Sequence, residues 1–202
     1  MARKYVKTFQ LNAKLNNADY DLIVSPISKD NKWRELSPFH LGPCTTPRGD
    51  TFHNMENLWQ FSKVYPQLGH VDSKGNITDT WHKWYDNGCS LKRAQRHPAG
   101  KGSKPAFSLY SGRRLSYISA RKIIYIPWYA RLAQTTEAFH YLDTEYRAGA
   151  RIAIKDYDCY DHEDLGMTLR DVIESEHKIM GHGFVLAMML MYGKDFWRRL
   201  VI

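Results

Sequence analysis

The chain has 202 residues, of which 43% are hydrophobic and 25% charged, and its formal net charge is +8. This balance is typical of a globular protein and excludes a disordered one, and the length suits a single domain over residues 1–202. Three cysteines that lie far apart argue against a disulfide framework or a thiolate zinc site, and fit a reducing cytoplasm. The basic N-terminus lacks the apolar run of a signal peptide, and the longest apolar segment, 183–192, is about half a membrane span. We therefore expect a soluble cytoplasmic protein that does not enter a membrane.

The first elements that the sequence predicts are two short strands, residues 5–11 and 20–24, because both segments are rich in β-branched and aromatic side chains. The segment 36–50 holds three prolines and two glycines and is predicted to be a loop. Loops of this length in a compact domain are often functional. An amphipathic helix is expected to follow from about residue 54 to Tyr65, where Pro66 ends it.

The remainder of the chain is predicted to be mostly helical, after a turn-rich excursion over residues 69–80. Apolar spacing over 114–142 favours a helix that Pro127 should kink or split. The other predicted helices are 81–96 with an interruption near Asn87 and Gly88, 137–151, 165–176 and the nearly all-apolar, buried 183–200. Together with the few short N-terminal strands, about six helices predict a mainly α fold.

Charge is distributed unevenly along the chain. Residues 87–136 contain ten Lys or Arg and no Asp or Glu, whereas 137–176 contain eleven acidic residues against four basic ones. Glycine and serine within the basic segment let the backbone approach an anion. We expect this segment to attract phosphate on a nucleotide or along a nucleic acid. The alternative interpretation is a solvated surface that the acidic segment balances.

The predicted helix "FHNMENLWQFSKVY" carries one narrow polar stripe. Glu56, Gln60 and Lys63 are spaced i, i+4 and i+7 and fall within about 60° of arc. Such a stripe is commonly a solvent-facing surface with i,i+3 and i,i+4 contacts. Because Trp59 borders it and the loop 36–50 runs directly into it, the stripe is also a candidate wall of a pocket.

The stretch "LSPFHLGPCTTPRGDTFHNMENLWQFSKVYP" resembles the opening motif of the NADAR family, also called YbiA-like. Its Glu56, Gln60 and Lys63 match the family's Glu-x-x-x-Gln-x-x-Lys pattern without a gap. Ser37 and Phe39 match the ends of a Ser-Asn-Phe element, in which proline stands here for asparagine. Asn57 occupies a position where the family usually has histidine.

The resemblance is looser downstream. Asp158, in "DYDCYDHED", is the nearest counterpart of the family's Asn-Asp-x-x-Trp-Gly element, although the Trp-Gly pair is missing. The segment "GHGFVLAMMLM" is similar in character to the family's final helix but lacks its asparagine.

The resemblance implies a single-domain, YbiA-like helical fold and a hydrolase that acts on N-glycosyl bonds. NADAR-like N-glycosidases cut the bond between ribose C1 and a base nitrogen, as in ADP-ribosylated guanine of DNA or RNA or in a related free N-riboside. By resemblance, Lys63 is the nucleophile that forms a Schiff base with the opened sugar. A lysine nucleophile must be neutral, so its pKa must fall from about 10.4 by burial or by a cationic neighbour.

Glu56 is placed to act as the general acid and base for Lys63. The expected substrate-binding residues are Gln60, Asn57, Phe39, Ser37, Trp59, Asp158, Arg113 and Arg114. We expect no metal and no cofactor, and the expected partner is a phosphate-bearing N-riboside, either free or within DNA or RNA. The oligomeric state stays open.

Several alternatives also stay open. The same fold could act on another modified base in DNA, with Asn57 and Asp158 marking a different substrate. A non-catalytic nucleotide-binding or nucleic-acid-binding module would use the same pocket or the basic surface without turnover. A phenylalanine such as Phe39 is more often simply a core residue, and Asp158 suits a solvated acidic loop at least as well as a substrate site.

Overall fold

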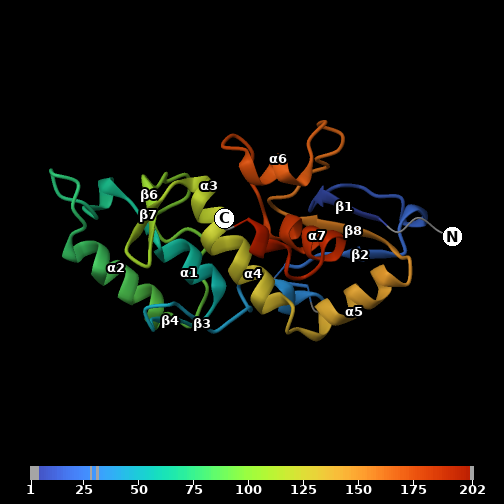
Figure 1. Ribbon diagram of the computed structural model, residues 1–202, viewed down its shortest axis with the longest axis horizontal. Helices are drawn as coiled ribbons and strands as arrows, with labels where there is room; N and C mark the ends of the chain where they lie inside the picture. The colour runs from blue at the N-terminus through green and yellow to red at the C-terminus, as the bar shows by residue number, and fades with distance from the viewer. Residues whose placement is uncertain (1–4, 28, 31, 201–202) are drawn as a thin grey trace. The chain divides into compact units, whose positions relative to one another are not determined.

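The computed structural model describes residues 5–27, 29–30 and 32–200 (Figure 1). The chain divides into two compact units: unit 1 takes its described residues from 1–37 and 126–202, and unit 2 comprises Pro38–Tyr125. Helices and three small sheets make the fold mixed α/β. The prediction of a mainly α, YbiA-like helical fold is therefore wrong, because short strands form in segments that were assigned to helices and loops.

Unit 1 contains a parallel three-stranded sheet. Its strands are β1 (Tyr5–Gln10), β8 (Arg151–Asp156) and β2 (Leu22–Val24), with β8 in the centre. The two N-terminal strands are confirmed, whereas β8 was predicted as the end of a helix and a loop. Ile152 and Ile154 of β8 are fully buried, as expected for the central strand of a sheet covered by other elements.

The helices of unit 1 pack around α7 (His182–Tyr192), which contacts β1, β8, α4 and α5. Eight of its residues, from Gly183 to Leu190, are buried, so the predicted burial is confirmed, but the helix does not extend to residue 200 as predicted. The helix ends at Gly193, which has a positive φ of 91°, and a 3₁₀ turn follows. The other helices of this unit are α4 (Ile126–Ala133), α5 (Glu137–Arg147) and α6 (Leu169–Glu174), and the 3₁₀ turns are Asn17–Asp19, Arg34–Leu36 and Phe196–Arg199.

The start of α7 is joined to the end of β8 through the carboxylate of Asp156. This carboxylate accepts hydrogen bonds from the main-chain N–H groups of Tyr157 at 2.7 Å and Gly183 at 3.2 Å. His182 Nδ1 lies 3.2 Å from the same carboxylate, and His182 Nε2 lies 2.5 Å from the carbonyl oxygen of Pro26. Asp156 is thus a structural centre of unit 1.

Unit 2 combines helices with two small antiparallel sheets. The hairpin β6 (Phe107–Tyr110) and β7 (Arg113–Leu115) turns at Ser111 and Gly112, both of which have positive φ angles, 49° and 76°. Positive φ at both turn residues is the geometry of a two-residue hairpin. Strand β5 (Lys63–Val64) pairs with β6, and β3 (Cys44–Thr45) pairs with β4 (Thr51–Phe52). The helices of this unit are α1 (Met55–Phe61), α2 (Asp79–Ser90) and α3 (Tyr117–Ala120), with a 3₁₀ turn over Pro66–Leu68 and a π-helix over Arg121–Tyr125.

Two predicted helix interruptions have different outcomes. Helix α2 runs through Asn87 and Gly88 without a break. A Cβ atom on Gly88 would lie 2.3 Å from Cγ of Phe61, so the glycine lets α1 and α2 approach closely. Pro127 does accompany an irregularity, because five residues of π-helix, Arg121–Tyr125, immediately precede α4. Proline removes an i→i−4 hydrogen bond from a helix, and the π-helix ends two residues before Pro127.

Candidate functional site

Helix α1 positions the polar residues that the sequence singled out. It begins at Asn54, whose side chain accepts a hydrogen bond from the N–H of Asn57 at 2.9 Å, a standard N-terminal cap. The preceding loop is attached to the first turn: Met55 N–H donates to the Leu41 carbonyl at 2.8 Å, and Glu56 N–H donates to the Pro38 carbonyl at 3.0 Å. The half-buried Phe39 lies in this loop, directly after Pro38, whose carbonyl accepts the hydrogen bond from Glu56.

Glu56, Gln60 and Lys63 form a continuous hydrogen-bonded chain. Lys63 Nζ donates to Gln60 Oε1 at 2.7 Å, and Gln60 Nε2 donates to Glu56 Oε1 at 2.8 Å. Glu56 is 7% exposed and Gln60 9% exposed. Glu56 and Gln60 therefore face protein, Lys63 is half-buried, and the Gln60 amide joins the amine to the carboxylate.

Lys63 lies on a strand, which corrects the predicted helix boundary. Helix α1 ends at Phe61, and Lys63 pairs with Ser108 of β6. The helix cannot continue to Tyr65 because the main chain after Phe61 bonds to another segment. Leu109 N–H donates to the Ser62 carbonyl at 2.7 Å, and Ala106 N–H donates to the Val64 carbonyl at 2.9 Å. From this strand the Lys63 side chain still reaches Gln60 and donates a hydrogen bond to it.

The surroundings of Lys63 make its neutral form more accessible than that of an ordinary lysine. Burial lowers the pKa of the Lys63 amine to about 8, and the nearby negative charge of Glu56 only partly opposes this effect. Nζ lies 4.7 Å from the ring centre of Trp59, whose ring packs edge-on against Tyr125 at 5.0 Å. With a pKa of about 8, about one tenth of the amine is neutral at pH 7, against about one in three thousand for an ordinary lysine.

Asn57, predicted to bind substrate, is fully buried and bonded to main chain. Its Nδ2 donates to the carbonyls of Leu91 at 2.8 Å and Arg93 at 3.2 Å, and its Oδ1 accepts from the N–H of Gln95 at 2.9 Å. Asn54 Nδ2 adds a hydrogen bond to the carbonyl of Lys92 at 3.1 Å. These two asparagines therefore attach the start of the basic segment to α1.

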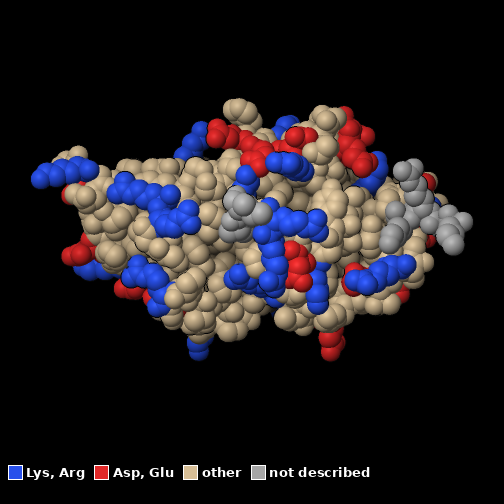
Figure 2. Space-filling view, viewed as in Figure 1, with Lys and Arg blue, Asp and Glu red and all other residues tan. Residues whose placement is uncertain are grey.

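The two predicted arginines lie on β7 in unit 2 and are exposed. Arg114 donates to the carbonyl of Gly75, and its guanidinium lies 4.8 Å from the ring centre of Phe107. Basic side chains, seen in blue, lie over the region of β6 and β7 on the left of Figure 2. This surface agrees with the phosphate attraction that the charge distribution suggests.

Two further predicted residues, Ser37 and Asp158, belong to unit 1. Ser37 is buried at the end of a 3₁₀ turn, where its N–H donates to the carbonyl of Arg34 at 3.0 Å. Asp158 is half-buried, and its main-chain oxygen accepts from Gly181 N–H at 2.9 Å. Their role in a substrate site stays a prediction.

Sequence reasoning missed two residues around Lys63, Ser108 and Tyr125, whereas Trp81 is one of the aromatic residues, with Trp84 and Trp128, that could replace the missing Trp-Gly pair. Ser108 is the strand partner of Lys63 and is 5% exposed. Trp81 Nε1 donates to the main-chain carbonyl of Lys63 at 3.3 Å. The Ser-Gly pair in "FSLYSGRRL" is a hairpin signal that could have identified Ser108 as a strand residue, whereas no local pattern identifies Tyr125.

The described residues contain no group of three or more His, Cys, Asp or Glu side chains arranged to hold a metal ion. Among the helices in that part of the chain, none combines the length and the apolar character that a membrane span requires.

A comparison with protein families finds no family model that matches this sequence, and a comparison with curated proteins finds no match either.

Proposed function

We propose that this protein is an N-glycosidase that cleaves the bond between ribose C1 and a base nitrogen through an imine on Lys63. The observation that carries the proposal is the hydrogen-bonded chain from the Lys63 amine through Gln60 to Glu56. Burial of Glu56 and Gln60 and a Lys63 pKa of about 8 supply what a lysine nucleophile needs. The resemblance to NADAR proteins agrees with this chemistry.

The first step breaks the glycosidic bond. The lone pair of neutral Lys63 Nζ forms a bond to C1, and the C1–N bond breaks with its electron pair going to the base. The carboxylate of Glu56 takes up the proton that Lys63 loses on becoming neutral, and passes that proton to the departing nitrogen. The C1–O bond of the sugar ring then opens. The ring oxygen takes a proton from the attacking nitrogen, which leaves a protonated imine between Lys63 and the opened ribose.

Water completes the cycle. The Glu56 carboxylate takes a proton from a water molecule whose oxygen adds to the imine carbon, so that Glu56 regains the proton it gave away. The resulting carbinolamine breaks its C–N bond to release the sugar aldehyde, which closes to ribose, and neutral Lys63. The net reaction consumes one water per N-riboside and yields the free base and the ribose product.

Substrate class is proposed from charge. Unit 2 carries nine Lys or Arg and no Asp or Glu between residues 87 and 125. Asn54 and Asn57 hold the beginning of this segment on the same helix that carries Glu56 and Gln60. A phosphate-bearing N-riboside, such as ADP-ribosylated guanine in a nucleic acid, suits these surroundings better than an uncharged nucleoside.

Borohydride trapping tests the proposal. An oligonucleotide that contains ADP-ribosylated guanine is mixed with the protein and borohydride, and peptide mass spectrometry locates any adduct. We expect a reduced adduct on Lys63 and, in the absence of borohydride, release of ADP-ribose, which leaves unmodified guanine in the oligonucleotide. Lys63→Ala should abolish both, and Lys63→Arg, which keeps the positive charge, should abolish them equally.

The alternative of a non-catalytic binding module predicts a different result. Such a module would bind the oligonucleotide without product and without adduct, and Lys63→Ala would leave its affinity nearly unchanged. Absence of any adduct with a panel of N-ribosides, under conditions in which a known imine-forming glycosidase is trapped, would refute the imine mechanism.

A further inference from the structure

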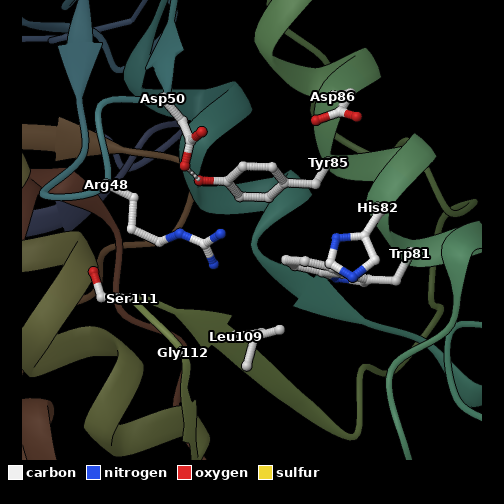
Figure 3. Close-up of a pocket in the computed structure, with 9 residues that line it drawn as sticks. All are labelled: Arg48, Asp50, Trp81, His82, Tyr85, Asp86, Leu109, Ser111 and Gly112. Carbon is white, nitrogen blue, oxygen red and sulfur yellow. Dashed lines mark hydrogen bonds between the residues drawn. The ribbon is translucent and has the colours of Figure 1, made fainter.

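Unit 2 contains a pocket that none of the chemistry above uses (Figure 3). It has a cavity volume of about 70 Å³ and is open to solvent. Its lining residues are Arg48, Asp50, Trp81, His82, Tyr85, Asp86, Leu109, Ser111 and Gly112. Three segments contribute them: the loop before β4, the first half of α2, and the hairpin of β6 and β7.

The pocket is distinct from the Lys63 site. Lys63 is paired with Ser108 across β5 and β6, so their side chains share one face of this sheet. Successive residues of a strand point to opposite faces. Leu109, which lines the pocket, therefore points to the face opposite the Lys63 side chain.

One wall of the pocket is aromatic. Trp81 and Tyr85 lie one turn apart on α2 with ring centres 5.0 Å apart and planes inclined by 32°. Trp81 is buried, whereas Tyr85 is half-buried and presents its ring to the open space (Figure 3). A planar ring in the pocket would have an aromatic surface to stack on.

The polar groups of the pocket include both donors and acceptors. The guanidinium of Arg48 points toward the ring of Tyr85 (Figure 3), and no described residue forms a hydrogen bond or ion pair with it. The carboxylate of Asp50 is held in place by the hydroxyls of Tyr85 at 3.2 Å and Thr46 at 3.3 Å. Burial raises the pKa of Tyr85, so its hydroxyl stays protonated and donates to Asp50.

The charges of Arg48, Asp50 and Asp86 restrict the class of ligand that the pocket can bind. A simple anion would meet Arg48 but also the carboxylates of Asp50 and Asp86, and a simple cation would meet Arg48. A planar group with hydrogen-bond donors and acceptors on its edge can satisfy both signs at once, as a nucleobase does. The volume of about 70 Å³ holds several water molecules and suits the edge of one base, not a whole nucleotide.

An exposed arginine adjoins the pocket. The turn Ser111–Gly112 on its rim leads directly into Arg113, which is exposed on β7. No carboxylate of the described residues forms an ion pair with Arg113. A ligand whose base occupies the pocket would leave its sugar and phosphate outside, on the side of the hairpin.

We propose that this pocket binds the base of a nucleotide between Tyr85 and Arg48, with the phosphate of the nucleotide against Arg113. The site is independent of the glycosidase proposal, since it shares no side chain with the Lys63 chain of hydrogen bonds. The nucleotide can be a free nucleoside monophosphate or one unit of a polynucleotide, because both present the same chemistry.

Isothermal titration calorimetry with the four nucleoside monophosphates, and with a tetranucleotide of the base that binds best, tests this site. We expect at least one mononucleotide to bind, and Arg48→Ala and Tyr85→Leu to weaken its binding at least tenfold. Arg93→Ala, which removes an exposed positive charge outside the pocket, is the matched control and should change affinity less than twofold. Arg48→Ala and Tyr85→Leu should leave borohydride trapping on Lys63 unchanged, which separates this result from the fate of the glycosidase proposal.

Further binding measurements identify the class of ligand and its source. Ribose 5-phosphate should bind at least tenfold more weakly than the nucleotide, because it lacks the base. A tetranucleotide that binds more tightly with steep salt dependence identifies a polynucleotide, and equal affinities identify a free nucleotide. Tyr85→Phe, which keeps the ring, controls for folding. The proposal is overturned if no mononucleotide binds at millimolar concentration, or if Arg93→Ala weakens binding as much as Arg48→Ala.

Discussion

The side-chain oxygen of Gln60 lies 2.7 Å from the amine nitrogen of Lys63. The acceptor is thus a neutral amide, and a carboxylate in the same position would favour the charged ammonium. Gln60→Glu is therefore expected to raise the Lys63 pKa above about 8 and to slow imine trapping at pH 7 by about tenfold for each pKa unit gained.

The control for this change is Gln60→Met, which removes the hydrogen bond without adding charge. It should not raise the pKa of Lys63, although it interrupts the path to Glu56. The pH dependence of borohydride trapping distinguishes the two variants. Identical pH profiles for the wild type and Gln60→Glu would show that the Gln60 amide does not determine the pKa of the Lys63 amine.

The low pKa of Lys63 predicts a distinctive pH dependence of its reactivity. Because only the neutral amine attacks a carbonyl carbon, its rate of reaction with a small aldehyde should rise with pH and level off above about 8. Reductive labelling at a series of pH values, followed by peptide mass spectrometry, measures this rate. Exposed Lys74 provides the internal reference. Equal pH profiles for the two lysines would contradict the prediction.

Stability should depend on pH through the same group. The folded-state pKa of Lys63 is about 8, against 10.5 for the ordinary residue, so the unfolded chain binds more protons between these two values. The contribution of Lys63 to the free energy of unfolding should then rise with pH across this window. Lys63→Met lacks the ionisable group. The difference in unfolding free energy between Lys63→Met and the wild type should shrink as pH rises from 8 to 10.5, measured by denaturant titration.

Asn57 is expected to be structural. Asn57→Ala removes three side-chain hydrogen bonds to the main chain of residues 91–95 and leaves buried polar groups unpaired, which should cost about 2–4 kcal/mol of stability. The released segment should be cut faster by trypsin after Lys92 and Arg93. Limited proteolysis and denaturant unfolding measure the two effects, and Gln95→Ala, which keeps its main-chain N–H, is the control that should change neither.

Gly181 is expected to tolerate no side chain. A Cβ atom there would lie 2.2 Å from Oδ2 of Asp156 and 3.0 Å from Cβ of Asp158. Gly181→Ala must therefore displace the carboxylate that holds His182 and the start of α7, at a cost of about 1–3 kcal/mol or more. Thermal unfolding measures the loss. A melting temperature equal to that of the wild type would show that Asp156 is free to move.

The polar stripe is the part of the site that the sequence predicts best. Spacing of i, i+4 and i+7 places Glu56, Gln60 and Lys63 on one side of a helix, and this side proves to be internal. The sequence could not predict that Lys63 lies on a strand. Pairing of Lys63 with Ser108 depends on a hairpin some forty residues further along the chain, and local periodicity carries no information about such pairing.

The fold class fails for a related reason. A six-residue segment such as Arg151–Asp156 is too short for its apolar residues to distinguish a strand from a helix end. Its identity comes from pairing with β1 and β2, near the opposite end of the chain. Helix α7, in contrast, is long and apolar on all sides, so its burial could be predicted without knowledge of its neighbours.

The indole of Trp81 contacts both the nucleotide pocket and the strand of Lys63. Its ring lines the pocket of Arg48 and Tyr85, and its N–H donates to the main-chain oxygen of Lys63. A ligand that displaces this indole must also strain or release the strand beneath the reactive amine. Thermodynamic linkage makes any such coupling reciprocal. If a pocket ligand stabilises or destabilises the covalent sugar adduct on Lys63, the adduct changes the binding free energy of the pocket ligand by the same amount.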